Sequence, residues 1–165
     1  MPNSIAIRVA TSNDVETIFS LVMDLAKTLG NTRDVGSTVE DLRTFGFGDH
    51  AFYKALIAEQ GGKPVGLCIY YMTFSSWRGS PGVCILDLFV NESVRGTGLG
   101  RRLMAEVAFA GRSVGATFLH LAVHHSNESG QAFYQRMGMT PADMEQVYQI
   151  EGHSFDALIG EVEEN

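Results

Sequence analysis

The chain has 165 residues, of which 45% are hydrophobic and 19% charged, a composition typical of one folded domain with a substantial core. Its formal net charge of −7 disfavours nucleic acid as a partner. Residues 1–10 lack a signal-peptide pattern, and no apolar run reaches membrane-spanning length. Cys68 and Cys84 lie in apolar runs typical of buried thiols in a reducing compartment. We therefore expect a cytoplasmic protein without a membrane partner, with a single domain over residues 1–165.

Periodicity and turn signals divide the chain into strands and helices. In chain order, we expect a strand over Ile5–Ala10, a helix from Thr11 to Gly30, a short helix from Ser37 to about Phe45, strands over Phe52–Glu59, Val65–Phe74 and Gly82–Val90, a helix from Leu99, a strand over Thr117–Val123, a helix over Glu128–Met137 and a strand over Met144–Ile150. Thr11 with Asp14, and Ser37 with Glu40, form capping-box patterns.

This order predicts the fold class. Consecutive strands around a hairpin precede a strand-helix-strand-helix unit, so the sheet should be mixed, with antiparallel and parallel pairs. Helices should cover both of its faces, because helical segments occur before and after the run of strands. We therefore predict an α/β fold with a central mixed sheet.

The segment "ESVRGTGLGRRLM" (Glu92–Met104) places glycines and arginines where a helix begins. Amide hydrogens at a helix N-terminus lack intrahelical partners and favour an anion, and glycine removes the Cβ that would obstruct it. A Walker A loop requires Gly-Lys-Ser/Thr, which is absent. A Rossmann fingerprint requires different glycine spacing and an acidic residue at the end of the next strand, which is also absent.

The remaining pattern, Arg-x-x-Gly-x-Gly at Arg95, Gly98 and Gly100, resembles the coenzyme A pyrophosphate loop of the GNAT superfamily of N-acyltransferases. A second segment, "NESGQAFYQRMGM" (Asn127–Met139), resembles the part of these enzymes that follows the fifth strand. The resemblance implies the GNAT acyl-CoA N-acyltransferase fold and acetyl-CoA as cosubstrate.

The resemblance also implies roles for particular residues. Tyr134 is the candidate general acid that protonates the departing thiolate, and a core tyrosine packed beside Phe133 is the alternative. The main-chain groups of Leu88, Phe89 and Val90 are expected to pair with the pantetheine amides. The complete set expected at the coenzyme is Leu88, Phe89, Val90, Arg95, Gly96, Thr97, Gly98, Leu99, Gly100, Arg101, Asn127, Ser129 and Tyr134.

Four blocks in one register resemble the spermidine/spermine (diamine) N-acetyltransferase family, which includes thialysine ε-amine acetyltransferases. They are "FGFGDHAFYKALIAE", "YYMTFSSWRG", "DLFVNESVRGTGLG" and "NESGQAFYQRMG". The resemblance implies an enzyme that acetylates a small primary amine by direct attack in a ternary complex, usually as a homodimer.

Several carboxylates of the polyamine enzymes are replaced here, which affects the expected substrate. The family's Glu-Asp pair becomes Leu86-Asp87, its Asp before Trp77 becomes Ser75, and His125 stands where a carboxylate is expected. Each buried ammonium needs a partner, so the loss favours a diamine or a lysine-like amino acid over spermine. Basic residues that could meet an amino acid's carboxylate are Arg33, Arg43 and Arg78.

Three residues are candidates for binding the amine. Asp87 would orient the ammonium, and His125 or a water chain would accept its proton, with a solvated loop histidine as the alternative. Trp77 would wall the pocket with an aromatic face, or it packs elsewhere or at a dimer interface. We expect no metal, because the histidines lack a third ligand at suitable spacing. A non-catalytic acyl-CoA-binding module, or an acetyltransferase of a protein or antibiotic amine, remains an alternative.

Overall fold

The computed structural model describes residues 4–142 and 145–163, in two compact units, Met1–Glu128 and Ser129–Asn165. The elements of the first unit are β1 (Ile5–Val9), α1 (Val15–Leu29), α2 (Val39–Gly46), β2 (Lys54–Gln60), β3 (Lys63–Ser75), β4 (Ser80–Val90), α3 (Leu99–Arg112) and β5 (Phe118–Leu121), with short 3-10 turns at Ser12–Asp14, Thr32–Asp34 and Glu92–Val94. Helices α4 (Glu128–Arg136) and α5 (Gly152–Glu163) follow.

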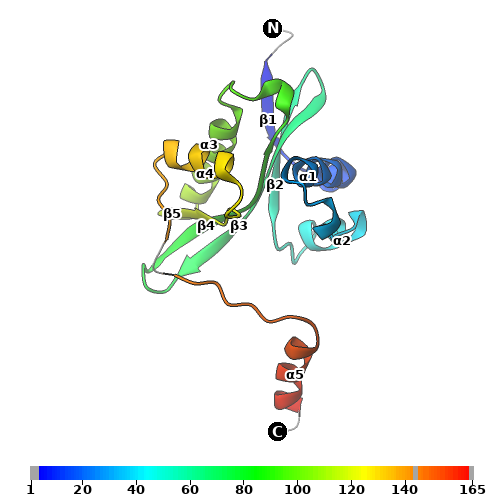
Figure 1. Ribbon diagram of the computed structural model, residues 1–165, viewed down its shortest axis with the longest axis vertical. Coiled ribbons are helices and arrows are strands. Elements are labelled where there is room, and N and C mark those ends of the chain that lie inside the picture. Colours follow the sequence, from blue (N-terminus) through cyan, green and yellow to red (C-terminus); the bar gives the residue numbers. More distant parts are fainter. Residues whose placement is uncertain (1–3, 143–144, 164–165) are drawn as a thin grey trace. The chain divides into compact units, whose positions relative to one another are not determined.

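The five strands form one mixed sheet in the order β1-β2-β3-β4-β5. Every neighbouring pair is antiparallel except β4 and β5, which run parallel. Helices α1 and α2 lie on one face of this sheet and α3 on the other (Figure 1). The predicted mixed sheet with helices on both faces is therefore confirmed.

Each face of the sheet has its own apolar packing. On the α1 side, Ile18 and Leu21 pack with Ile57, Leu67 and Phe89 in one buried cluster. On the opposite side, α3 approaches β4 so closely that a Cβ at Gly111 would overlap the Val83 side chain. The buried positions of α3 are Leu99, Leu103, Met104, Val107 and Gly111, which recur at helical spacing. The first four were expected from the sequence, whereas Ala108, also expected on this face, is exposed.

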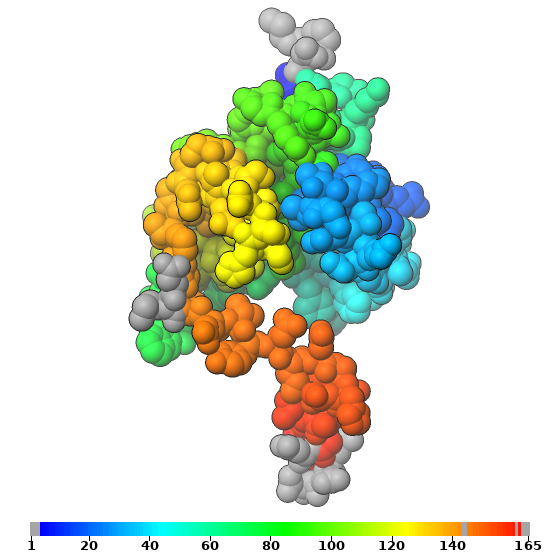
Figure 2. Space-filling view, viewed as in Figure 1, coloured from blue at the N-terminus to red at the C-terminus, as the bar shows by residue number. Residues whose placement is uncertain are grey.

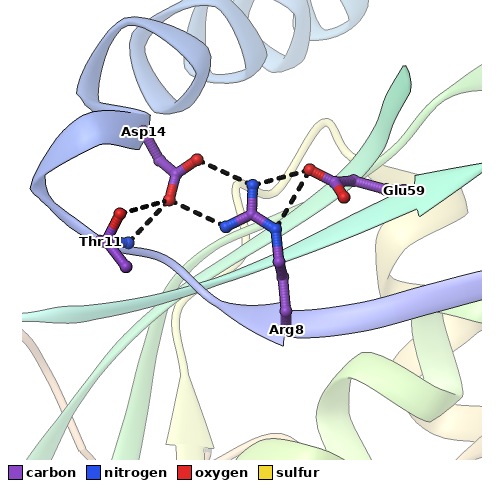
Figure 3. Close-up of polar contacts among 4 residues, drawn as sticks. All are labelled: Arg8, Thr11, Asp14 and Glu59. Carbon is purple, nitrogen blue, oxygen red and sulfur yellow. Dashed lines mark hydrogen bonds and ion pairs between the residues drawn. The ribbon is translucent and has the colours of Figure 1, made fainter. Parts of the chain in front are cut away.

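A charged cluster fixes the start of α1 to the sheet (Figure 3). The Arg8 guanidinium donates to both carboxylate oxygens of Asp14 at 2.8 Å, and to Glu59 of β2 at 2.7 Å. Asp14 also accepts from the backbone N–H of Thr11 at 2.7 Å, so the predicted capping pair is confirmed. These hydrogen bonds, with the Arg8 pair the largest contribution, hold the pKa of Asp14 well below its usual range.

Two local predictions shift by a few residues. The cap of α2 is Thr38 with Asp41, one residue beyond the expected Ser37 and Glu40, because Thr38 Oγ1 accepts from the Asp41 N–H at 3.1 Å. Strand β5 ends at Leu121, two residues before its predicted end. Gly30 ends α1 in the left-handed conformation, as expected.

The expected closing strand over Met144–Ile150 is a larger difference. Met144 lies outside the described residues, and residues 145–150 belong to no strand. Their alternating pattern is strand-like, but a strand forms only against a partner edge, and the sheet ends at β5. The prediction is therefore wrong for residues 145–150.

None of the helices in the described part of the chain combines the length and apolarity that a bilayer span requires.

Candidate active site

The loop before α3 has a backbone conformation that only glycine adopts without strain. Gly96 has φ +78° and Gly98, the N-cap of α3, has φ +83°. Apart from the adjacent residues, no heavy atom lies within 4 Å of the place where a Cβ would stand at either glycine. A ligand can therefore approach the main chain here. This loop has the geometry of an anion-binding helix N-terminus, because the first amide hydrogens of α3 lack intrahelical acceptors.

Arg95 closes this loop onto the end of β4. Its Nε donates to the Val90 carbonyl oxygen at 3.1 Å, and its backbone N–H donates to the Glu92 carbonyl oxygen at 3.2 Å. Thr97 Oγ1 donates to the Val94 carbonyl oxygen at 2.7 Å. The bond through Nε ties the guanidinium to the end of β4 and does not use its terminal amino groups, which are donors suited to an anion.

The remaining residues of this segment divide into charged and anchoring positions. Leu99 is buried, so the first turn of α3 is fixed against the sheet. Arg101 is exposed at the same end of the helix. Arg102 has a structural contact instead, because its Nη2 donates to the Ile5 carbonyl oxygen of β1 at 2.9 Å. Arg101 is therefore the second candidate for anion binding, and this role stays a prediction.

Strands β4 and β5 pair over only a short length. Their pairing joins Gly82 through Ile85 to Phe118 through Leu121 and goes no further. Beyond it, the edge of residues 88–90 that faces away from β3 has no strand partner in the described sheet. This is the segment Leu88, Phe89 and Val90 whose main chain was expected to pair with pantetheine. The parallel pair thus opens where the predicted interaction requires it.

A β-bulge lies at the point where the two strands separate. Ile69 of β3 pairs with Asp87 and Tyr70 pairs with Ile85, so Leu86 is an extra residue. Cross-strand partners share a face, which places Asp87 with Ile69 on the α1 and α2 side of the sheet. Leu86 itself is 52% exposed. The bulge was not predicted, because it depends on register with β3 and leaves no local signal in the sequence.

Asp87 is half-buried on this face. Burial raises the pKa of its carboxyl group above the ordinary value. The neighbouring Cys68 is buried, and desolvation, followed by the charge of Asp87, raises the pKa of its thiol to about 12. Cys68 therefore stays protonated at neutral pH and is a poor nucleophile. This agrees with direct attack by the amine rather than a covalent enzyme intermediate.

Other predicted substrate residues lie in loops, except Arg43, which lies in α2. Trp77 stands in the turn between β3 and β4 and is 99% exposed. His125 is also exposed, in the turn after β5. The Nη1 group of Arg43 donates a hydrogen bond to the Ser12 carbonyl oxygen at 3.3 Å. Arg78 lies 4.8 Å from the centroid of the Phe118 ring.

Arg33 differs from these two arginines. It lies in the exposed 3-10 turn after α1, and no partner is found for it among the described residues. Of the three arginines, it is therefore the one whose side chain has no such contact in the described part of the chain.

The second predicted segment begins in the turn after β5. The backbone N–H of Asn127 donates to the His124 carbonyl oxygen at 2.9 Å. Ser129 and Tyr134 belong to α4, in the second unit, and Tyr134 is half-buried. The Phe133 and Tyr134 rings pack edge to face with centroids 5.2 Å apart. This contact fixes the tyrosine ring, and the catalytic role of Tyr134 stays a prediction.

Helix α5 was missed by the sequence interpretation. The side chains of α5 follow a helical spacing of i, i+3, i+4 and i+7, at Phe155, Leu158, Ile159 and Val162.

A metal site was not expected from the sequence. The described residues contain no group of three or more His, Cys, Asp or Glu side chains that could hold a metal ion.

The acetyltransferase (GNAT) family model matches residues 22–139, and the chain belongs to this family. It is an acetyl-CoA-dependent N-acetyltransferase that acts on an amine. Thialysine N-epsilon-acetyltransferase of Bos taurus is 30% identical over 167 residues, covering 94% of this chain and 98% of the relative. Spermidine/spermine N(1)-acetyltransferase-like protein 1 of Homo sapiens is 26% identical, covering 87% of this chain and 22% of that protein.

Solved structures agree with the fold. An integron cassette protein from V. cholerae has a TM-score of 0.78 at 22% identity, covering 94% of this chain and 98% of that one. An aminoglycoside acetyltransferase from an uncultured soil metagenomic sample, in complex with sisomicin, has a TM-score of 0.72 at 17% identity, covering 90% and 95%. At these identities the likeness concerns the fold alone.

The residues present fit acetyl-CoA. No side chain or backbone atom outside the adjacent residues obstructs the approach to Gly96 and Gly98, and Arg95 and Arg101 carry the positive charge that a diphosphate would need. The unpaired edge of residues 88–90 offers backbone groups to an amide-containing arm.

Proposed function

We propose that this enzyme acetylates a primary amine of a small diamine or a lysine-like amino acid. The observation that carries the proposal is Asp87, a half-buried carboxylate that the β4 bulge places at the opening between β4 and β5. A buried ammonium needs one such partner. Arg33, which has no partner among the described residues, would meet a carboxylate at the far end of a lysine-like substrate.

Acetyl-CoA, when bound, supplies a thioester whose acetyl carbon an amine can attack. The contribution of the chain is to bind, orient and move protons. Asp87 holds the ammonium, whose free pKa of about 10.4 requires that a proton leave before attack. His125, or water, takes that proton, and the Tyr134 hydroxyl protonates the departing thiolate. Arg95, Gly98 and Arg101 anchor the diphosphate.

We also propose the broader setting of this reaction. The enzyme works as one acetyltransferase domain over residues 1–165, in the cytoplasm, as a homodimer, and without nucleic acid, membrane or metal partners. The negative net charge supports the absence of nucleic acid.

An amine panel tests the proposal. Protein and acetyl-CoA are mixed with diamines, polyamines, lysine, thialysine and an aminoglycoside, and released thiol is followed. We expect turnover to be fastest with a diamine or a lysine-like amino acid. Faster turnover with spermine or the aminoglycoside would refute the proposed substrate class.

The role of Asp87 is tested by Asp87→Asn beside the control Glu106→Gln, which removes an exposed carboxylate from α3. We expect Asp87→Asn to raise KM for the amine about tenfold or more, with the Kd of acetyl-CoA unchanged. Glu106→Gln should change neither. An unchanged amine KM in Asp87→Asn would place the ammonium elsewhere.

A further inference from the structure

Strand β5 carries a histidine that the reaction scheme above does not use. His120 is exposed, and no hydrogen-bond or ion-pair partner for its ring nitrogens is found among the described residues. Its ring packs beside that of Phe118, with the centroids 6.0 Å apart. The chain around residue 120, yellow in Figure 2, forms part of the molecular surface. The contact with Phe118 therefore positions the imidazole, while its nitrogens stay available to a substrate or to water.

The pairing register places His120 on the same face of the sheet as Asp87. Tyr71 of β3 lies two residues beyond Ile69, so it faces the α1 and α2 side of the sheet as Ile69 does. Tyr71 pairs with Cys84 of β4, and Cys84 pairs with His120 of β5. Because paired residues share a face, His120 also faces the α1 and α2 side, where Asp87 lies.

Side-chain contacts support this assignment of faces. The Tyr71 side chain hydrogen-bonds Cys84, and this contact, followed by desolvation, raises the pKa of the Tyr71 hydroxyl. Two residues earlier in β4, a Cβ at Gly82 would overlap the ring of its β5 partner Phe118. Phe118 and His120 are in turn two residues apart on β5, and their rings are neighbours, as alternation requires of side chains on one face.

Asp87 and His120 flank the opening between β4 and β5. The pairing of these strands ends at Ile85 and Leu121, so Asp87 lies two residues beyond it and His120 one residue before its end. Strand spacings put the Cα atoms of Asp87 and His120 about 10 Å apart. This separation leaves room for the nitrogen of an ammonium at Asp87 and for one water molecule between that nitrogen and the imidazole.

The groups around His120 suit the binding and deprotonation of an ammonium. The neighbouring strands bring Cys84, Asp87 and Tyr71 to this face, and Arg78 lies over the ring adjacent to the imidazole. Asp87 has no hydrogen-bond or ion-pair partner among the described residues. The side chains that α1 and α2 contribute to the cluster on this face are apolar, namely Ile18, Leu21, Val22, Leu25 and Leu42.

We propose that His120 is the general base of the reaction and takes a proton from the ammonium at Asp87, directly or through one water. The inference rests on the proposed function, in which Asp87 holds the ammonium. It gives the water route for that proton an end point on the protein. His125 lies in the turn after β5, where strand register places it on neither face of the sheet.

The protons and electron pairs of this step balance. Once His120 has taken the first proton, the nitrogen lone pair attacks the thioester carbonyl carbon. The C–N bond forms and the C–S bond breaks, and the thiolate leaves with the electron pair of that bond and gains a proton from the Tyr134 hydroxyl. The nitrogen releases its second surplus proton to solvent as the amide forms. The imidazolium also returns its proton to solvent, and one proton from solvent restores Tyr134.

The pH profile of kcat tests this role. His120→Gln is compared with the control His50→Ala, which removes an exposed histidine from the turn after α2. Both are measured at saturating acetyl-CoA and at saturating concentrations of whichever amine of the panel is fastest, because any alkyl ammonium must lose a proton before attack. In wild type and in His50→Ala, kcat should fall as pH drops through the range in which an imidazole gains a proton. In His120→Gln, kcat above neutral pH should be lower by about 10²-fold or more, and this fall should be absent.

Asp87 also gains a proton as pH falls, and its effect is separable. Burial raises the pKa of Asp87, so its protonation begins at a higher pH than that of an exposed aspartate. A protonated Asp87 binds the ammonium less tightly, which raises KM for the amine and leaves kcat at saturation in place. The acid fall of kcat therefore reports the base, and the rise of KM reports Asp87.

His120→Ala tests whether the imidazole acts as a base rather than as packing for Phe118. Added imidazole should raise the turnover of His120→Ala about tenfold or more and should not stimulate His50→Ala. Circular dichroism checks folding, and calorimetry checks that the Kd of acetyl-CoA is unchanged. If His120→Ala does not fold, the pH profile of His120→Gln decides.

Three results would overturn the proposal. The first is full turnover in His120→Gln. The second is reduced turnover that keeps the acid fall of kcat and does not respond to imidazole, which would assign His120 to packing. The third is loss of the acid fall in His125→Ala instead, which would place the base in the turn after β5. None of these results alters the amine KM of Asp87→Asn, so failure of His120 as the base is distinguishable from failure of the amine site.

Discussion

Replacing Gly98 with alanine tests whether the main chain at the start of α3 holds the cosubstrate. Gly98 has φ +83°, and an alanine in this left-handed region costs about 1–2 kcal/mol. The added Cβ meets no heavy atom within 4 Å, so backbone strain is the main cost to the free protein. Because about 1 kcal/mol shifts the Tm of a chain this long by roughly 2–4 °C, Tm should fall by about 2–8 °C.

Gly115→Ala is the matched control. Gly115 lies beyond the other end of α3, has φ +88° and also has no heavy atom within 4 Å of a Cβ. Its alanine variant should lose a similar amount of Tm in a thermal scan. Calorimetric titration with acetyl-CoA should separate the two variants. Gly98→Ala raises Kd at least about tenfold, or about 1.4 kcal/mol, because its methyl group occupies the approach of the diphosphate, whereas Gly115→Ala leaves Kd unchanged.

Two results would refute this reasoning. An unchanged Kd in Gly98→Ala would mean that the diphosphate does not approach the main chain at this residue. Equal weakening in both variants would mean that strain in α3, rather than obstruction of the site, controls affinity.

Three further predictions concern single side chains. Tyr134→Phe should lower turnover roughly 10–10³-fold with the Kd of acetyl-CoA unchanged, and unchanged turnover would return Tyr134 to a packing role. Arg95→Ala should weaken acetyl-CoA binding in calorimetry, and its affinity should depend less on salt than that of wild type; identical salt dependence would contradict the phosphate contact. Asp14→Asn should cost about 2 kcal/mol of unfolding free energy at neutral pH. The pKa of Asp14 is lowered by Arg8, so its contribution is present above the unfolded pKa of about 3.9 and is lost as pH falls through the folded pKa. Urea unfolding should therefore show the difference between wild type and variant shrinking below about pH 4, and a constant difference down to pH 2 would contradict the ion pair.

Features determined by nearby residues could be predicted from the sequence. The helix that starts at the glycines before Leu99, the cap at Thr11 and the turn at Gly30 each depend on contacts within a few positions. The glycine loop before α3 belongs to this group, because glycine spacing and helix polarity are both local, and its anion binding stays a prediction.

Features that depend on pairing between distant segments could not be predicted. Arg8 binds Glu59, 51 residues away, and neither residue shows this in its own surroundings. Alternation indicated that residues 145–150 favour an extended chain, but it did not show whether an edge of the same chain would receive them.

The extra residue at Leu86 separates what the fold requires from what catalysis requires. Because of the bulge, Ile85 and Asp87 lie on opposite faces of β4, although a single residue separates them. Deleting Leu86 would make them consecutive residues, which lie on opposite faces in any regular strand. Asp87 and Phe89 would therefore keep their face. The shortened strand would run straight, and its pairing with β5 could continue past Ile85. Such a deletion should yield a well-folded protein without the opening between β4 and β5, which is the place where the thioester arm would enter.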